Sequence, residues 1–221
     1  MCGRFAFYSP GEATAALFGV DTSIEIEPRY NIAPSQYIAG IRETDEQGRE
    51  LTMFRWGLVP FWAKDPAIGN RMINARSETV AEKPSFRAAY RHRRCLVLAD
   101  GFYEWKKEGD VKVPYFISLA SGEPFAFAGL WESWTGKETG ETIQSTTLIT
   151  TAANEYMSSV HHRMPVVLQT ETAIRWLAGD NEVVTDVAAN SPQFQAWPVD
   201  RRVNNARNEG ADLITRQDSL D

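Results

Sequence analysis

Cysteine and histidine are scarce in this chain of 221 residues, which has two cysteines and three histidines. Two thiols cannot form a disulfide framework or a four-thiolate zinc site, and three histidines do not supply a metal site either. We therefore expect no metal, no other cofactor and a reducing compartment.

Long apolar runs, repeats and linkers rich in glycine, serine or proline are also missing. No stretch approaches the ~20 apolar residues that span a bilayer, and the first residues carry no targeting pattern. Basic residues are not in excess, because 23 Lys and Arg stand against 29 Asp and Glu, for a formal charge of −6. We expect a cytoplasmic protein without a membrane partner, and any nucleic acid must meet a local basic face.

The composition is that of a globular protein, with 43% apolar and 24% charged residues. Alternating apolar runs predict strands, with a hairpin in the first pair, at residues 37–42, 51–56, 96–98, 102–105, 115–119, 125–131 and 146–151. Helical patterns occur at residues 10–18, where Ser9 is the expected capping residue and Pro10 the first helical position, and at 77–83, 86–91 and 171–178. The predicted class is α+β, mostly antiparallel, in one domain over residues 1–221 whose last part, about 204–221, is a polar and mobile tail.

Cys2 is the most informative residue, because removal of Met1 would leave a free α-amine and a thiol on one carbon framework. Both groups titrate near neutral pH, so both are nucleophilic there. Such a group can attack an amide or ester carbonyl, or it can condense with an aldehyde into an imine that the thiol closes to a thiazolidine. The alternative is an incidental cysteine at a frayed terminus, while Cys95 has the pattern of a core residue.

Asn74-Ala75-Arg76-Ser77-Glu78-Thr79 runs from a loop into the expected helix at 77–83, whose N-terminus would favour anions. Residues 71–94 carry six arginines and one lysine against two glutamates, a local charge of +5. A phosphate backbone could bind this face, although solvated charges on an exposed helix are the alternative.

Two further segments could move protons. Glu104 lies within the aromatic run 101–105, where partial desolvation would raise its pKa toward the range of a general acid or base. His161 and His162 stand before the expected strand 166–168, and adjacent histidines usually point in different directions, so one of them is expected to face a site. A solvent-facing carboxylate and an ordinary loop are the alternatives.

Together the motifs resemble the SOS-response-associated peptidase (SRAP) family in its bacterial form. They are, in chain order, Met-Cys-Gly-Arg-Phe, Tyr-Asn-Ile-Ala-Pro at 30–34, Arg-Trp-Gly-Leu-Val-Pro at 55–60, the 74–79 segment, Gly-Phe-Tyr-Glu-Trp at 101–105 and His-x-Arg-Met-Pro at 161–165. The resemblance implies curved, barrel-like antiparallel sheets with short helices. It also implies self-removal of Met1 and a covalent crosslink to abasic sites in single-stranded DNA. No oligomer is implied, and we expect a monomer that is associated with the nucleoid when it is bound to DNA.

The family's functional residues carry over position by position. Cys2 would form the crosslink, Asn74 would orient its amine and the opened sugar, Glu104 would act as acid and base, and His161 would serve the deoxyribose oxygen. Phosphates would be held by Arg4, Arg76 and Arg163, and the lesion would be packed by Pro34 and Trp105. One position departs from the family: His162 stands where aspartate is common.

Two rival functions stay open on the sequence alone. The first is an N-terminal-nucleophile hydrolase of the glutamine amidotransferase type, because those chains also begin Met-Cys-Gly. The second is a non-catalytic module that binds single-stranded DNA through its arginines and does not use Cys2.

Overall fold

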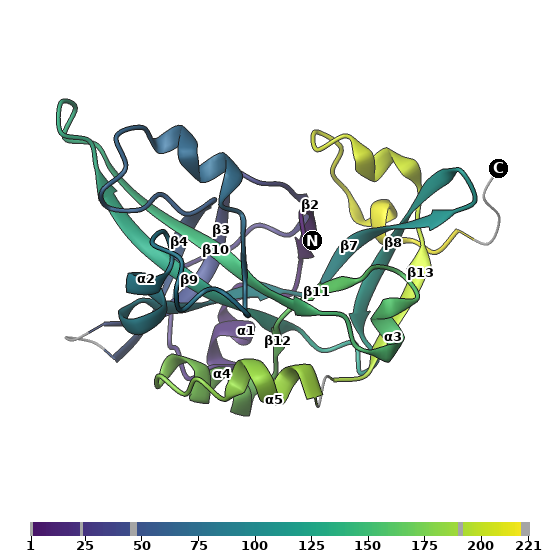
Figure 1. Cartoon of the computed structure of the whole chain (residues 1–221). Coiled ribbons are helices and arrows are strands. Elements are labelled where there is room, and N and C mark those ends of the chain that lie inside the picture. Colours follow the sequence, from purple (N-terminus) through teal and green to yellow (C-terminus); the bar gives the residue numbers. More distant parts are fainter. Residues whose placement is uncertain (1, 23, 45–47, 190–191, 218–221) are drawn as a thin grey trace.

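The computed structural model describes residues 2–22, 24–44, 48–189 and 192–217, and its strands form two sheets (Figure 1). Five strands close into a barrel in which each pairs with the next and the last returns to the first. In order around the barrel these are β4 (Gly48–Trp56), β3 (Tyr37–Thr44), β6 (Arg94–Ala99), β9 (Phe125–Thr135) and β10 (Thr142–Ala152). The predicted α+β class is confirmed, and the sheets are mainly antiparallel.

Three short strands pair with the parts of β9 and β10 that extend beyond the closed ring. β5 (Asn74–Arg76) runs parallel to β10, while β11 (Arg163–Pro165) and β12 (Val167–Leu168) pair antiparallel with β10 and β9. Because β5 and β11 both pair with β10 at Thr150, the 74–79 and 161–165 motifs meet around one strand end.

The second sheet has the order β13-β8-β7-β1-β2. Its strands are β1 (Phe5–Phe7), β2 (Arg29–Ile32), β7 (Gly101–Glu108), β8 (Val111–Leu119) and β13 (Phe194–Pro198). In β1, Phe5 faces Phe102 of β7 and Ile32 of β2, so the first strand of the chain lies between β7 and the edge strand β2.

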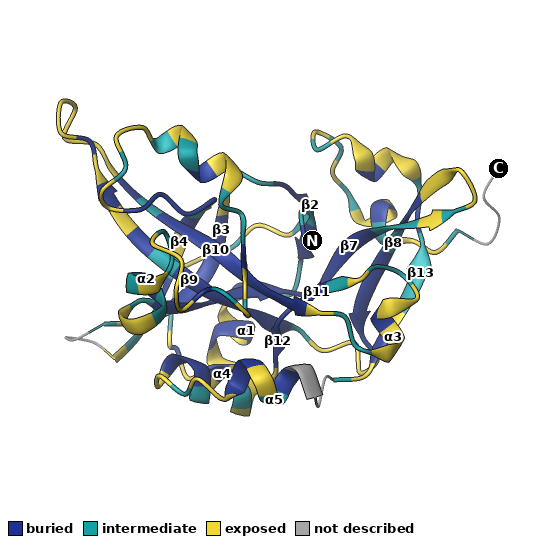
Figure 2. Cartoon of the chain, in the orientation of Figure 1, coloured by how far each residue is buried: buried dark blue, intermediate teal, exposed yellow. Residues whose placement is uncertain are grey.

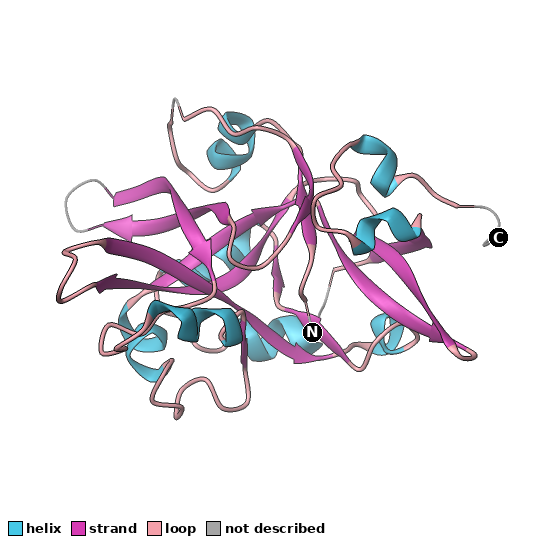
Figure 3. Cartoon of the chain, turned by 90° about the horizontal axis from the view of Figure 1, so that it is seen from above, coloured by secondary structure: helices cyan, strands magenta, loops and turns pink. Residues whose placement is uncertain are grey.

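Short helices cover the edges of the strands, as the view from above shows (Figure 3). They are α1 (Gly11–Leu17), α2 (Arg87–His92), α3 (Glu155–Ser158), α4 (Thr170–Leu177) and α5 (Val183–Ala189), with 3₁₀-helices at Pro66–Arg71, Arg201–Asn204 and Ala211–Ile214. Among the described residues, no helix is long and apolar enough to cross a bilayer.

Buried side chains follow the barrel strands and β7 and β8 (Figure 2). The main cluster includes Phe5, Phe102 and Phe127, whose rings meet edge to face at centroid distances of 5.6 and 6.1 Å. Cys95 is fully buried in β6 with its Sγ 3.3 Å from Thr146 Oγ1, so its predicted place in the core is confirmed. One apolar core therefore joins the two sheets.

Two local predictions are wrong. Residues 77–82 form turns instead of a helix, because the Ser77 amide donates to the carbonyl of Thr150 and continues the pairing with β10. Ser9 does not cap α1: its hydroxyl and amide donate to the carboxylate of Asp100 instead.

The C-terminal segment is packed, contrary to the mobile tail expected from its polar composition. Leu213 is fully buried, and Trp197 Nε1 donates to the carbonyl of Ile214 over 2.8 Å. The side-chain Nδ2 of Asn31 donates to the main-chain carbonyls of Asn205 and Asn208 at 3.0 and 2.8 Å. Buried amide contacts thus tie residues 203–214 to the second sheet, and residues 218–221 of the expected tail lie outside the described residues.

Candidate active site

Cys2 lies at the junction of the two sheets, three residues before β1. Its side chain is 0% exposed, and its thiol donates to the carbonyl of Arg4 with an Sγ···O distance of 3.8 Å. Burial raises the pKa of the Cys2 thiol far above its usual range, and the negative charge of Glu104 raises it further. The thiol is therefore protonated at neutral pH.

Asn74 holds the main chain of Cys2. Its Nδ2 donates to the Cys2 carbonyl over 2.8 Å from β5, so a strand paired with the barrel holds the segment that leads into the other sheet. The Asn74 Oδ1 is buried without a hydrogen-bond donor among the described residues. This oxygen can accept a hydrogen bond from an N–H or O–H group of a molecule that enters the site.

Glu104 reaches the same place from β7. The Tyr103 amide donates to the Arg4 carbonyl over 2.9 Å, which aligns β7 with the segment that contains Cys2. Glu104 is 4% exposed, and burial raises the pKa of its carboxyl. The desolvated carboxylate expected from the sequence is therefore present, and it lies close enough to act electrostatically on the Cys2 thiol.

The two histidines follow α3 and precede β11. Their rings lie 4.3 Å apart and are tilted by 32°, so they project to the same side and the expected divergence is wrong. Burial lowers the pKa of His161, whereas His162 is exposed and the His161 ring lowers its pKa. The charge of Glu104 also influences His162, which brings this pair into the electrostatic surroundings of the site.

The three arginines predicted to bind phosphate differ in how they are held. Arg76 is exposed at the end of β5. Arg4 is half-buried, and its Nη1 donates to Asn31 Oδ1 at 2.7 Å and to the Val203 carbonyl at 2.6 Å. Arg163 is 12% exposed and forms a two-pronged ion pair with Glu78. Arg76 is therefore the most accessible of the three.

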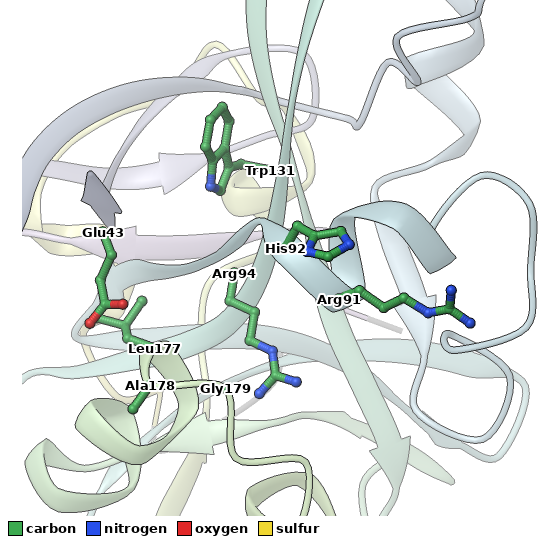
Figure 4. A pocket seen from close by; sticks show the side chains of 8 residues that line it. All are labelled: Glu43, Arg91, His92, Arg94, Trp131, Leu177, Ala178 and Gly179. Atoms are coloured by element: carbon green, nitrogen blue, oxygen red, sulfur yellow. The ribbon is translucent and has the colours of Figure 1, made fainter. Parts of the chain in front are cut away.

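The expected basic face over residues 71–94 is not a single face. Arg94 is buried, stacks on Trp176 at 4.2 Å and donates to the carbonyls of Trp176 and Asp180, while Arg93 pairs with Glu132 at 2.9 Å. Figure 4 shows Arg94 pointing toward the end of α4, beside a pocket of about 300 Å³ that Arg91 also lines. Part of the local charge of +5 is thus used in structural contacts and does not contribute to an exposed basic face.

Of the two residues expected to pack around the lesion, Trp105 lies in β7 of the second sheet and Pro34 follows its strand β2. Trp105 follows Glu104, and its Nε1 donates to Asn204 Oδ1 over 2.7 Å. Pro34 is half-buried two residues beyond β2, the strand that pairs with β1.

Three residues in these contacts escaped the sequence analysis. Asn31 and Glu78 belong to the quoted motifs, so their positions were visible, but their partners are far away in sequence. Asn204 begins the segment expected to be a polar tail, so its contact with Trp105 could not be anticipated.

The sequence profile of the family SOS response associated peptidase (SRAP) matches residues 1–206. The chain belongs to the SRAP family. It is similar to the abasic site processing protein YoaM of Bacillus subtilis, with 39% identity and 100% of each chain covered. The abasic site processing protein YedK of Escherichia coli is 36% identical, with 97% of this chain and 99% of YedK covered.

A relative from a vertebrate and a solved structure extend the comparison. The abasic site processing protein HMCES of Xenopus tropicalis is 32% identical over 84% of this chain and 65% of its own length. A crystal structure of a protein from Bacteroides thetaiotaomicron superposes with a TM-score of 0.84 at 26% identity, covering 98% of this chain and 100% of that one.

Proposed function

We propose that this protein recognises abasic sites in single-stranded DNA and forms a covalent thiazolidine crosslink through Cys2 after it removes its own Met1. The observation that carries the proposal is the convergence on Cys2 of Asn74 from the barrel and Glu104 from the other sheet. The SRAP relatives YoaM, YedK and HMCES are abasic site processing proteins, which supports an abasic site as the target. Met1 itself lies outside the described residues.

The state of the Cys2 thiol determines the order of steps. Because burial keeps the thiol protonated, the α-amine released with Met1 makes the first attack, on the aldehyde carbon of the open sugar. The carbinolamine loses water to an imine, and the thiol then adds across the C=N bond, with sulfur on carbon and the proton on nitrogen. One water leaves overall, and the DNA stays attached.

Protons must move at two places during this sequence. Glu104, whose pKa is raised by burial, accepts a proton from the α-ammonium and returns it as the carbinolamine loses water. His161 gives a proton to the ring oxygen of the closed sugar, which opens to the aldehyde. Asn74 Oδ1 accepts from the amine or from a sugar hydroxyl.

DNA binding uses side chains around this centre. Arg76, Arg4 and Arg163 contact phosphates, while Trp105 and Pro34 pack beside the lesion. The contacts are to the backbone and to base faces, so binding is sequence-tolerant. We further propose a monomer that works in the cytoplasm and joins the nucleoid when it is bound to DNA.

Intact mass spectrometry after incubation with an abasic oligonucleotide tests the proposal. We expect a product whose mass is that of the Met1-free chain plus the oligonucleotide minus one water, and no such product from Cys2→Ala. Full retention of Met1 in freshly purified protein would contradict it. Ammonia release from glutamine would support the amidotransferase alternative, and tight binding without a covalent product would support a simple binding module.

A further inference from the structure

Glu78 takes no part in the proposed chemistry, although it belongs to the motif that supplies Asn74 and Arg76. It lies in the turn after β5, and both of its carboxylate oxygens accept hydrogen bonds from Arg163, one of them over 3.1 Å. These bonds lower the pKa of Glu78, so the pair is ionised at neutral pH. The Glu78 carboxylate is half-exposed while the guanidinium is nearly buried.

Arg163 is held from a second direction by β10. Its Nη2 donates to the Thr150 carbonyl at 2.7 Å and approaches Thr150 Oγ1 at 3.3 Å. Thr150 also pairs with Arg76 of β5 and with Pro165 of β11. The guanidinium is therefore fixed between the end of the barrel and the turn that contains Glu78.

The main chain of Arg163 in turn holds the ring of His161. Both the amide nitrogen and the carbonyl oxygen of Arg163 lie 3.0 Å from His161 Nδ1. A neutral Nδ1 without hydrogen accepts from the amide, and a protonated Nδ1 donates to the carbonyl. The ring thus keeps its orientation in either state, and Nε2 is the nitrogen that can exchange a proton with the substrate.

We propose that Glu78 is a positioning residue for His161 and acts through Arg163. The inference rests on the proposed function, in which His161 opens the closed sugar. In that step the Nε2–H bond breaks, an O–H bond forms at the ring oxygen and the bond from this oxygen to C1′ breaks. The C1′ hydroxyl loses its proton to water as the aldehyde C=O forms. The other ring nitrogen, Nδ1, keeps its hydrogen and donates it to the Arg163 carbonyl.

A different role for Glu78 makes a different prediction. If the carboxylate only occupied Arg163 until a DNA phosphate displaced it, its neutralisation would release the guanidinium. Glu78→Gln would then bind single-stranded DNA more tightly and react no more slowly. The positioning role predicts the opposite pattern, with a slower reaction at nearly unchanged affinity.

The experiment measures single-turnover crosslinking at saturating abasic DNA for Glu78→Gln, with Glu82→Gln as the matched control. Glu82 is an exposed glutamate in the same turn segment. We expect Glu78→Gln to react about three- to tenfold more slowly, the effect of losing about one net hydrogen bond, with affinity for intact single strands within about twofold. Glu82→Gln should match the wild-type protein.

Two further measurements separate positioning from a general structural role. Glu78→Gln should cause no additional loss in a His161→Ala background, because residues that act through one another are not additive. Its defect should also disappear with an oligonucleotide that carries an aldehyde unable to close into a ring. An additional loss in the His161→Ala background, or an equal defect with the open aldehyde, would overturn the proposal.

Protein folding and the proposed function are checked in the same series. Glu78→Asp keeps the charge and should crosslink at a rate between those of wild type and Glu78→Gln. If Glu78→Gln unfolds at a lower temperature than wild type, Glu78→Asp replaces it in the comparison. The inference would then be overturned if His161→Ala slows crosslinking and Glu78→Asp does not. Failure of the proposed function has a separate signature, because the wild-type protein would then give no crosslink with either substrate.

Discussion

The side-chain amide of Asn74 donates a 2.8 Å hydrogen bond to the main-chain carbonyl of Cys2. Asn74 belongs to β5, which the parallel pairing with β10 attaches to the barrel, whereas Cys2 precedes β1, a strand of the other sheet. The position of the cysteine therefore depends on the contact between the two sheets.

Asn74→Asp should slow crosslinking about 2- to 10-fold, because the isosteric carboxylate cannot donate to the Cys2 carbonyl and one net hydrogen bond is lost. Single-turnover rates measure the effect. Asn70→Asp is the control, since the amide oxygen of Asn70 accepts from Arg55 and Ser35 and the carboxylate can replace it. Equal rates for wild type and Asn74→Asp would remove the orienting role.

Glu104→Gln should slow crosslinking by about 10²–10⁴-fold, the usual contribution of a positioned acid-base group. In the wild-type protein the rate should fall as the pH drops through the raised pKa of Glu104, because the protonated carboxyl cannot accept a proton. Rate profiles over pH test both statements, and a rate of Glu104→Gln within twofold of wild type would exclude the role.

The same substitution should stabilise the fold at neutral and alkaline pH. A folded-state pKa above the unfolded value favours folding below the unfolded pKa, and this contribution is lost as the pH rises through the folded pKa. Above that range the wild-type protein carries a buried carboxylate that Gln lacks. Melting curves should show a higher Tm for Glu104→Gln at pH 8, with the difference shrinking or reversing at pH 4.

Arg76→Ala should weaken binding to all single-stranded sequences alike, because Arg76 is exposed at the end of β5 and is expected to contact a phosphate. The slope of log affinity against log salt should become shallower by about 0.7, the value for one contact on a single strand. Arg91→Ala, an exposed arginine beside the pocket in Figure 4, is the control and should keep the wild-type slope. An unchanged slope in Arg76→Ala would place the phosphate contacts elsewhere.

His161→Ala should slow crosslinking more than His162→Ala does. His161 is the histidine whose ring is held by the Arg163 main chain, whereas His162 is exposed. Burial lowers the pKa of His161, so the protonated imidazole that opens the sugar should accumulate only below about pH 6.5, the usual pKa of histidine. The opening step should therefore accelerate as the pH falls from about 6.5 toward the lowered pKa of His161. A larger defect in His162→Ala would show that His162, and not His161, has this role.

Local patterns predicted the strands well because alternation and aromatic content act within a few residues. The hairpin of β3 and β4 and the position of Glu104 in β7 follow from such patterns. The closure of the barrel by the parallel pair β4 and β10 does not, since its partners, Arg55 and Ser145, lie far apart in sequence.

Tertiary hydrogen bonds explain the local errors. Residues 77–83 have helical propensity, but the Ser77 amide donates to the Thr150 carbonyl and the segment forms turns. The hydroxyl of Ser9 donates to the Asp100 carboxylate, as does its amide, so Ser9 does not cap α1. The roles of Cys2, Asn74 and His161 came from the family resemblance and from chemistry. The contact between Cys2 and Asn74 joins residues 72 positions apart, which no local pattern encodes.

Arg4 donates to the carbonyl of Val203, a residue 199 positions later. During synthesis on the ribosome, a chain that has not reached Val203 cannot form this bond, and the segment that contains Cys2 lacks one of the contacts that hold it in the folded protein. Domains fold as their last contacts become available, at a pace set by elongation of about 5–20 residues per second. Under the proposed role of Cys2, the residue that forms the crosslink is synthesised first and reaches its finished surroundings only when residue 203 is in place.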